Sequence, residues 1–230
     1  MNSRRSFLKT VIIFSPGLAL HKSIIGSGID LPNVLILGDS ISIGYTPFVK
    51  EILLNEANIV RPVYDDGKPE NCEGTTKGVK EINRWIGDTK WDVIHFNFGL
   101  HDIKHVDPKT GKNSNNPNHP HQAGLKHYKK NLEKIVEVLK STGAKLIFAT
   151  TTPYPDHVEN PLRKPGMAEK YNKAALKIMY KNGIAINDLY TFMKPRMNYL
   201  QLPHNVHFTE AGYKALSIKV ADRIREALEE

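Results

Sequence analysis

Short, continuous apolar runs separated by amphipathic helical patterns are the feature that most constrains the fold of this chain. The run at residues 34–37 ends in Gly38, and similar runs recur at residues 91–98, 144–150 and 184–187, with a weaker one at 59–64. Runs that are apolar on both faces are typical of strands covered on both sides by helices. The pattern predicts an α/β domain with a central parallel sheet and right-handed crossovers.

Three long segments between or after these runs have helical periodicity. Apolar residues fall on one stripe at spacings of three and four from residue 125 to residue 139, and Gly143 ends the pattern. Residues 168–181 and 209–228 repeat the scheme, with Asn182-Gly183 after the first and Thr209 or its neighbour as the cap of the second. The stretch from residue 104 to residue 122 has no periodicity, and at about 19 residues it predicts a flexible functional loop over the site.

Composition and charge exclude several classes of protein. The chain has 230 residues with a net charge of +8, and its hydrophobic and charged fractions are those of a globular domain. Residues 1–26 contribute +4 of this charge, and the remainder carries 28 basic against 24 acidic side chains. This mild, mixed charge predicts no nucleic-acid partner. The single cysteine, Cys72, excludes an internal disulfide framework and a cysteine-based zinc site.

The first residues have the layout of an export signal. Arg4 and Arg5 precede a short apolar stretch, which resembles a bacterial twin-arginine signal. We therefore predict an export signal at residues 1–28 and one domain at residues 29–230, placed in the periplasm or outside the cell. No stable membrane association is expected after signal removal, because no run of 18 uncharged apolar residues occurs. The alternative is a basic amphipathic helix resting on the domain.

Chemically active residue types follow the predicted strands. Parallel strands end at one edge of a sheet, where loops can carry a site. Gly38-Asp39-Ser40 follows the first run, and Gly99-Leu-His-Asp102 follows the run at residues 91–98. The segment at residues 71–76 precedes one helix, and the segment at residues 204–209, which contains two histidines, precedes the last one. These segments are expected to meet at one site.

The blocks resemble the SGNH (GDSL) hydrolase superfamily. The first block is Gly38-Asp39-Ser40, the second matches at Gly74, and the last matches at His207, in family order over nearly all of residues 33–215. The resemblance implies a flavodoxin-like, three-layer α/β/α sandwich that hydrolyses esters, often acetyl or acyl groups on carbohydrate. The third and last blocks resemble bacterial members that are grouped with carbohydrate esterases.

Physical roles for these residues follow from their chemistry. Ser40 is the expected nucleophile, which needs a base to take its proton, and His207 is the expected base. The tetrahedral oxyanion needs donors placed in advance. The backbone N–H groups of Ser40 and Gly74 and the side chain of His101 are expected to supply them. Asp39 is expected to organise the nucleophile turn through backbone hydrogen bonds.

Two positions depart from the family pattern. His101 stands where the third block usually has asparagine, but a neutral imidazole can donate one hydrogen bond. His204 stands where an acid usually precedes the catalytic histidine by three residues. It could orient His207, as could a backbone carbonyl, and Asp102 and Glu210 remain open for this role.

Several other interpretations compete with the esterase. Ser40 could be a helix cap, His207 a packed histidine, and Cys72 a packed thiol. The cluster of His101, Asp102, His105, His119 and His121 suggests a metallohydrolase, but the proline-rich surroundings disfavour a helix that would hold it. A catalytically silent glycan-binding relative and a lipid or aryl esterase are the remaining alternatives. The expected partner is a small-molecule or polysaccharide ester, with no cofactor and no metal; the oligomeric state stays open.

Overall fold

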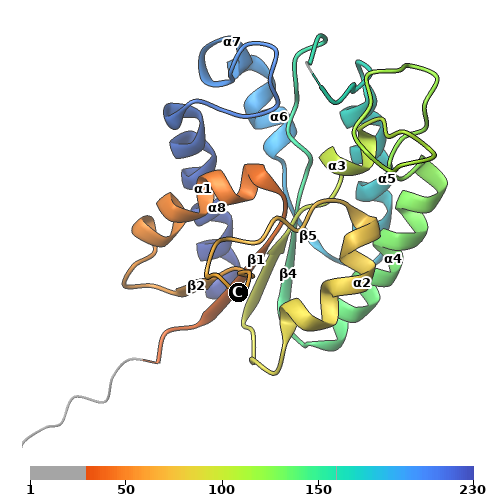
Figure 1. The fold of residues 1–230 in the computed structure, drawn as a ribbon. Coiled ribbons are helices and arrows are strands. Elements are labelled where there is room, and N and C mark those ends of the chain that lie inside the picture. Colours follow the sequence, from red (N-terminus) through yellow and green to blue (C-terminus); the bar gives the residue numbers. More distant parts are fainter. Residues whose placement is uncertain (1–29, 159) are drawn as a thin grey trace, which may run out of the picture. The chain divides into compact units, whose positions relative to one another are not determined.

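The centre of the protein is a sheet of five parallel strands in the order β2-β1-β3-β4-β5 (Figure 1). The computed structural model describes residues 30–158 and 160–230, so the predicted signal at residues 1–28 lies outside the described residues. The strands are β1 (Asn33–Leu37), β2 (Asn58–Val60), β3 (Val93–Phe96), β4 (Lys145–Ala149) and β5 (Ala185–Asn187). Each lies within or beside one of the apolar runs, so the prediction of a central parallel sheet is confirmed.

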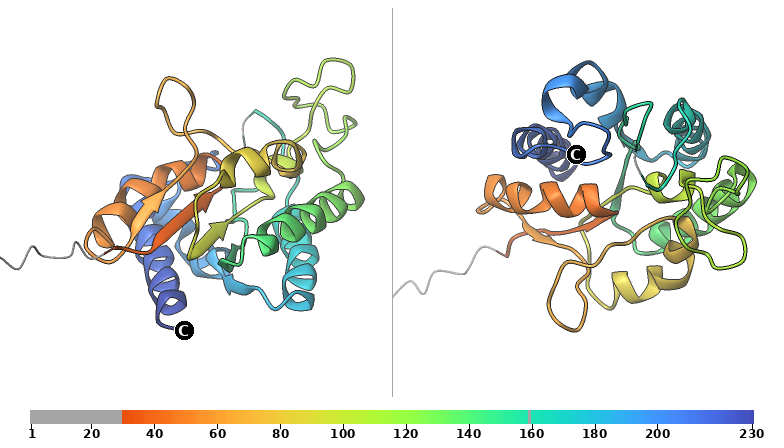
Figure 2. Two further views of the ribbon diagram at one scale, coloured as in Figure 1. Left: turned by 90° about the horizontal axis from the view of Figure 1, so that it is seen from below. Right: turned by 45° about the horizontal axis from the view of Figure 1, so that its top comes forward.

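Helices cover both faces of the sheet within the unit Leu31–Glu230 (Figure 2). Helices α1 (Ser40–Ile52) and α8 (Glu210–Glu229) pack together on one face. Helices α2 (Thr75–Ile86), α4 (Leu125–Ser141) and α5 (Met167–Lys181) follow one another on the other face. The shorter helices are α3 (Leu100–Ile103), α6 (Leu189–Met193), α7 (Met197–Leu200) and the 3-10 turn η1 (Lys194–Arg196). The predicted α/β/α layering is confirmed.

The core lies on both sides of the sheet. All residues of β3 are buried, and so are the last four of β1. The predicted stripe of α4 is buried on the sheet, and Tyr128 within it donates a hydrogen bond to the carbonyl of Phe98 at 2.9 Å. Helix α2 approaches α4 closely because Gly78 of α2 has no Cβ. A Cβ added there would lie 2.7 Å from Ile135 of α4. Close packing of this kind fixes where α2 begins, which matters for the site.

Strand register brings the strand ends to one edge. Leu37 pairs with Phe96, Phe96 with Phe148, and Ala149 with Asn187. The segments that follow these strands therefore leave the sheet side by side. Within the described residues, no helix is both long and apolar enough to cross a bilayer.

The predicted loop at residues 104–122 is held by its own hydrogen bonds. His105 bridges to His121, and Val106 bridges to Asn113. The N–H of His105 also donates to the carbonyl of Leu162 at 2.9 Å, which joins the loop to the segment between β4 and α5. The loop at residues 104–122 and the segment between β4 and α5 are therefore joined to each other.

Candidate active site

Ser40 is the first residue of α1, directly after the end of β1. The cap of this helix is Asp39, whose side chain accepts a hydrogen bond from the N–H of Ile41 at 2.9 Å. The Ser40 hydroxyl is therefore not used as a cap. Burial raises the pKa of Asp39, which lies within the turn and organises it, as the sequence suggested.

His207 lies opposite this serine. Its Nε2 is 2.9 Å from Ser40 Oγ, although 167 residues separate the two in the chain. His207 lies in the turn before α8, which is closed by the hydrogen bond from the N–H of Leu202 to the carbonyl of His207 at 2.9 Å. The structure thus brings together the two residues that the sequence assigned to nucleophile and base.

Asn205 orients the imidazole. Its Oδ1 accepts the backbone N–H of His207 at 3.0 Å and also lies 2.7 Å from His207 Nδ1. Because the backbone group is always a donor, the Asn205 atom must be the oxygen, and Nδ1 must then carry the proton. This tautomer leaves the lone pair of Nε2 directed at Ser40. Burial, followed by the positive charge of Arg163, lowers the pKa of His207, so the imidazole is neutral and can accept a proton.

His204 does not take the orienting role that was left open for it. Its Nδ1 lies 3.2 Å from the carbonyl oxygen of His157, and its side chain is exposed. Glu210 is also exposed and pairs with Lys214 at 2.6 Å. Asn205 is not among the residues that were predicted from the sequence. A signal did exist, because an asparagine often accepts the backbone N–H two residues further on.

His101 is the second residue of α3 and faces the same cleft as Ser40. Burial lowers the pKa of His101 to about 3, and nearby positive groups add to this effect. The ring is therefore neutral, with one N–H and one lone pair. Its Nδ1 has no hydrogen-bond partner among the described residues. A neutral imidazole that lines the cleft beside Ser40 has the chemistry expected of an oxyanion donor.

Gly74 is buried at the start of α2, against the side chain of Asp102. A Cβ on Gly74 would lie 2.9 Å from Asp102 Oδ2. Asp102 accepts hydrogen bonds from the N–H of Thr75, at 2.9 Å to Oδ1, and from the Thr75 hydroxyl. Asp102 therefore joins α3 to the start of α2, and its side chain is not bonded to His207. Gly74 is not among the described residues that line the cleft.

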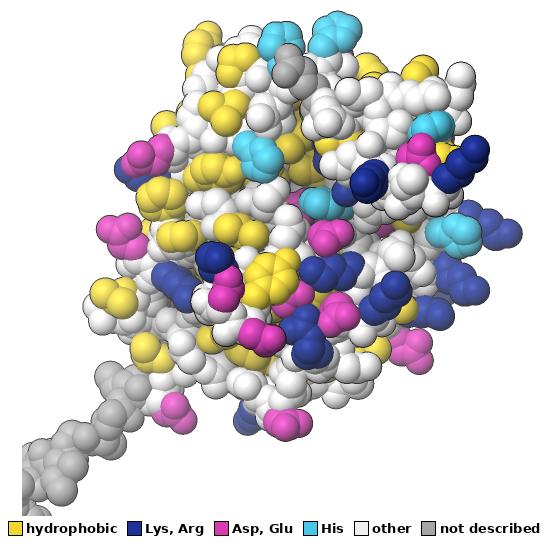
Figure 3. Space-filling view, in the orientation of Figure 1, with side chains coloured by type: hydrophobic (Ala, Val, Ile, Leu, Met, Phe, Trp, Pro, Cys, Tyr) yellow, Lys and Arg dark blue, Asp and Glu magenta, His cyan; other side chains and the backbone are white. Residues whose placement is uncertain are grey.

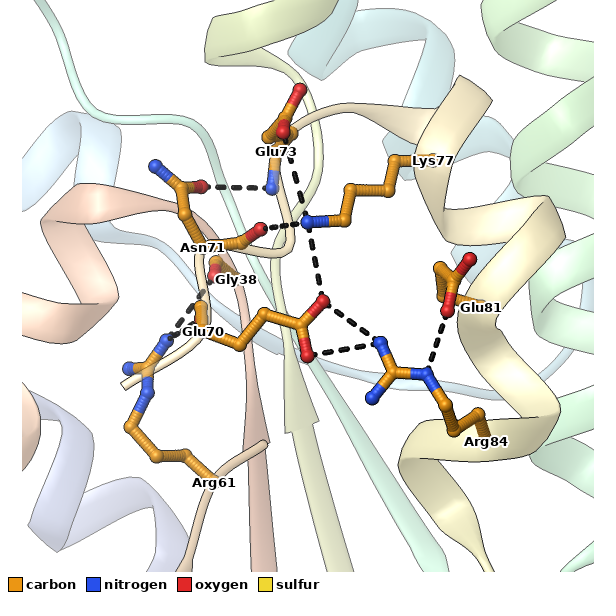
Figure 4. A network of polar contacts seen from close by, with 8 residues as sticks. All are labelled: Gly38, Arg61, Glu70, Asn71, Glu73, Lys77, Glu81 and Arg84. Atoms are coloured by element: carbon orange, nitrogen blue, oxygen red, sulfur yellow. Dashed lines mark hydrogen bonds and ion pairs between the residues drawn. The ribbon is translucent and has the colours of Figure 1, made fainter. Parts of the chain in front are cut away.

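A network around the buried side chains of Arg61 and Glu70 joins the two loops that enter the site (Figure 4). Arg61 donates to the carbonyl of Gly38 at 3.4 Å, and to the carbonyl of Glu70 at 2.9 Å. The carboxylate of Glu70 is bonded to Arg84 at 2.9 Å and lies 3.2 Å from Lys77 Nζ. Burial would raise the pKa of Glu70, but the bonds from Arg84 and Lys77 hold it below its ordinary value. The carboxylate is therefore ionised, and the nucleophile turn and the second block share one support.

The cleft over Ser40 has a volume of about 360 Å³ and is mostly polar. Its described lining comes from five segments of the chain and consists of Ser40, Asn71, Leu100, His101, Lys104, Asn113, Val158, Asn160, Pro161, Arg163, Asn205, Val206 and His207. The predicted loop at residues 104–122 contributes Lys104 and Asn113 to it. Arg163 belongs to this lining, whereas Tyr154 and Asn172 are bonded to backbone groups of the fold.

The remaining candidates have structural contacts. Asn97 donates to the carbonyl of Ala149 at 2.7 Å, beneath the site. Cys72 is buried, and burial raises the pKa of its thiol to about 12, so it is not a nucleophile. His105 and His121 each place Nδ1 2.6 Å from a backbone carbonyl. Among the described residues, no three side chains of metal-binding type come together.

Comparisons with known proteins agree with this geometry. The GDSL-like lipase/acylhydrolase family matches residues 36–215. A lipase/acylhydrolase from Enterococcus faecalis has a TM-score of 0.67 at 20% identity, covering 85% of this chain and 96% of that one. An acetyl xylan esterase from Geobacillus stearothermophilus has a TM-score of 0.65 at 16% identity, covering 84% and 94%. At these identities the two structures show the fold alone.

A search of curated proteins found no significant match. The family match covers most of the chain, including Ser40 and His207. The chain belongs to the GDSL-like lipase/acylhydrolase family, whose members are hydrolases.

Proposed function

We propose that this protein is an exported serine esterase that removes acyl groups, in particular O-acetyl groups, from a carbohydrate. The observation that carries the proposal is the contact between Ser40 Oγ and His207 Nε2 at 2.9 Å, with Nδ1 held by Asn205. A serine with a positioned neutral base is the arrangement required for acyl transfer.

The chemistry follows from the positions of the groups. Ser40 Oγ attacks the ester carbonyl carbon while its proton passes to His207 Nε2. The carbonyl oxygen becomes an oxyanion, for which the Ser40 N–H, the Gly74 N–H and the His101 side chain are the proposed donors. His207 then protonates the leaving alcohol, and the acyl group remains on Ser40. Water attacks this acyl-enzyme with His207 as base, which releases the acid and restores the serine.

Two observations support carbohydrate as the substrate class. The cleft lining is largely polar, which suits a hydroxyl-rich substrate better than a lipid chain. Among proteins with the same fold are esterases that act on acetylated xylan or its oligosaccharides. The paired Arg4 and Arg5 support export, which an N-terminal mass of secreted protein would test.

The decisive test is intact-mass analysis after treatment with a fluorophosphonate, with Ser40→Ala and His207→Ala beside the wild type. One adduct is expected on Ser40. Both variants should lose this adduct, and their ester turnover should fall at least about 10³-fold. Matched controls are Ser141→Ala and His127→Ala, which change exposed residues of α4. Sugar binding with no adduct and no hydrolysis would support the silent glycan-binding relative instead.

A further inference from the structure

The cleft over Ser40 contains two cationic side chains that the ester chemistry does not use. Lys104 directly follows α3, and Arg163 lies in the segment between β4 and α5. Both line the cleft together with Ser40 and His207. None of the described lining residues is a carboxylate. The described lining residues therefore carry a net positive charge, although the surrounding face carries both signs (Figure 3).

Arg163 is held in place by the backbone. It is only 5% exposed, and its Nε donates to the carbonyl of Leu100 at 3.0 Å. Its Nη1 donates to the carbonyl of Pro161 at 3.4 Å, while Nη2 makes no hydrogen bond with any described residue. The guanidinium is thus fixed by neutral backbone partners, and within the described part of the chain its Nη2 stays available to a ligand.

The acidic groups that act on these cations are occupied elsewhere. Among the described residues, Asp39 is the carboxylate whose charge acts on Arg163. The Asp39 side chain caps α1, however, and burial raises the pKa of Asp39. Glu73 and Asp102 act on Lys104. Of these, Glu73 lies 3.6 Å from Lys77 and Asp102 is bonded to Thr75.

Among the described residues Arg163 has no ion-pair partner, and a buried guanidinium of this kind is costly to the fold, because desolvation of a charge needs compensation. A fixed guanidinium fork binds a carboxylate through two parallel hydrogen bonds. We propose that the cleft takes an ester substrate that also carries a carboxylate, bound by Arg163 and Lys104. This proposal rests on the proposed esterase function, and it specifies the class of substrate. The carboxylate belongs either to the acyl part, as in a dicarboxylic half-ester, or to the alcohol part, as in an acidic sugar.

Two pairs of model substrates separate these sources. Phenyl hemisuccinate and its primary amide, phenyl succinamate, differ only in charge on the acyl part. The second pair, 4-acetoxybenzoate and 4-acetoxybenzamide, differs only in charge on the alcohol part. In the pair whose carboxylate lies on the same part as that of the natural substrate, kcat/KM for the carboxylate should exceed that for the amide by about ten- to hundredfold, as expected for a charge-assisted bond. The pair that shows the preference identifies the source.

Variants connect the preference to the two residues. Lys104→Gln and Arg163→Gln should each reduce the carboxylate-to-amide ratio at least about fivefold, with a smaller change on the amide. Arg163→Lys keeps the charge and loses the fork, and together with Lys104→Gln it carries the test if Arg163→Gln does not fold. Lys130→Gln, on the exposed face of α4, is the charge-matched control and should leave the ratio unchanged. Equal rates for carboxylate and amide in both pairs would overturn the proposal.

Calorimetry separates this proposal from the failure of the esterase itself. N-phenylsuccinamate, the amide analogue of the half-ester, is titrated into Ser40→Ala to test a carboxylate on the acyl part. N-(4-carboxyphenyl)acetamide is titrated in the same way to test a carboxylate on the alcohol part. Acetanilide is the neutral reference for both. Binding of either carboxylate that is weakened by Lys104→Gln supports the anion site even if no ester is hydrolysed. Affinities that match the neutral reference for both carboxylates would refute it even if the esterase is active.

Discussion

The side-chain oxygen of Asn205 lies 2.7 Å from Nδ1 of His207, and the same oxygen accepts the backbone N–H of His207. A neutral amide fixes the tautomer of the base but does not stabilise its protonated form as a carboxylate would. Asn205→Asp should therefore raise the pKa of His207 and move the acid limb of the kcat/KM–pH profile to higher pH. In the wild type this limb should lie below pH 6.5, since burial and Arg163 lower the pKa of His207.

The profile is measured with a neutral aryl acetate for wild type, Asn205→Asp and Asn83→Asp. Asn83 is exposed on α2, so this variant adds the same charge away from the site. An acid limb that moves equally in both variants would show that overall charge, rather than the contact with His207, controls the base.

His101 provides the second prediction. If its ring donates to the oxyanion, His101→Ala should lower kcat by about 10²–10³-fold. His101→Asn restores an amide donor and should stay within about tenfold of the wild type, on the same principle of donor placement. His157→Ala serves as control because His157 is exposed and its contact to His204 is made by the backbone. Similar losses for alanine and asparagine would exclude a donor role.

Gly74 provides a prediction about stability. A Cβ here would lie 2.9 Å from Asp102 Oδ2 and 3.1 Å from its backbone nitrogen, so Gly74→Ala should reduce the free energy of unfolding. The expected loss is about 1–3 kcal/mol, typical of overpacking. Gly124→Ala is the matched control: Gly124 also precedes a helix, has φ of −56°, and an added Cβ would meet nothing within 4 Å. Chemical denaturation that gives equal effects for both would contradict the crowding at Gly74.

Asp102 predicts a pH dependence of stability. Burial raises the pKa of Asp102 from 3.8 to about 7 in the folded protein, although the bonds from Thr75 act in the opposite direction. The folded state therefore binds more protons than the unfolded state between these values, and this contribution to stability falls as the pH rises from 4 to 7.

Asp102→Asn removes that titration. The wild type should lose about 1 kcal/mol or more relative to this variant between pH 4 and pH 7. Urea denaturation at several pH values measures the difference, with the exposed Asp65→Asn as control. A constant difference across the range would show that Asp102 ionises in the folded state as it does in the unfolded one.

The parts of this structure that could be predicted are those governed by burial. A strand that is covered on both faces needs apolar residues throughout, so the positions of the strands could be predicted directly from the apolar runs in the sequence. Ser40 and His207 could be located because the blocks that contain them resemble those of the SGNH hydrolases, and because one follows the first strand and the other precedes the last helix. Both positions lie at the sheet edge where a parallel fold places its site.

The contacts that could not be predicted depend on local loop geometry. His204 adopts φ of 53°, in the left-handed region, and with this turn Asn205 rather than His204 meets His207. The bond from Thr75 to Asp102 spans 27 residues and depends on how closely α2 and α3 approach. No periodicity in the sequence encodes either arrangement.

The separation of 167 positions between Ser40 and His207, its proposed base, has a consequence for biosynthesis. A chain emerging from the ribosome presents its nucleophile early, but the base comes from a turn closed by Gln201 and Phe208 and followed by α8, which packs on α1. Every nascent or truncated chain that stops before this turn carries a serine without a proton acceptor. Under the proposed mechanism, hydrolysis therefore requires a chain that has been translated beyond this turn and has folded so that α8 packs on α1.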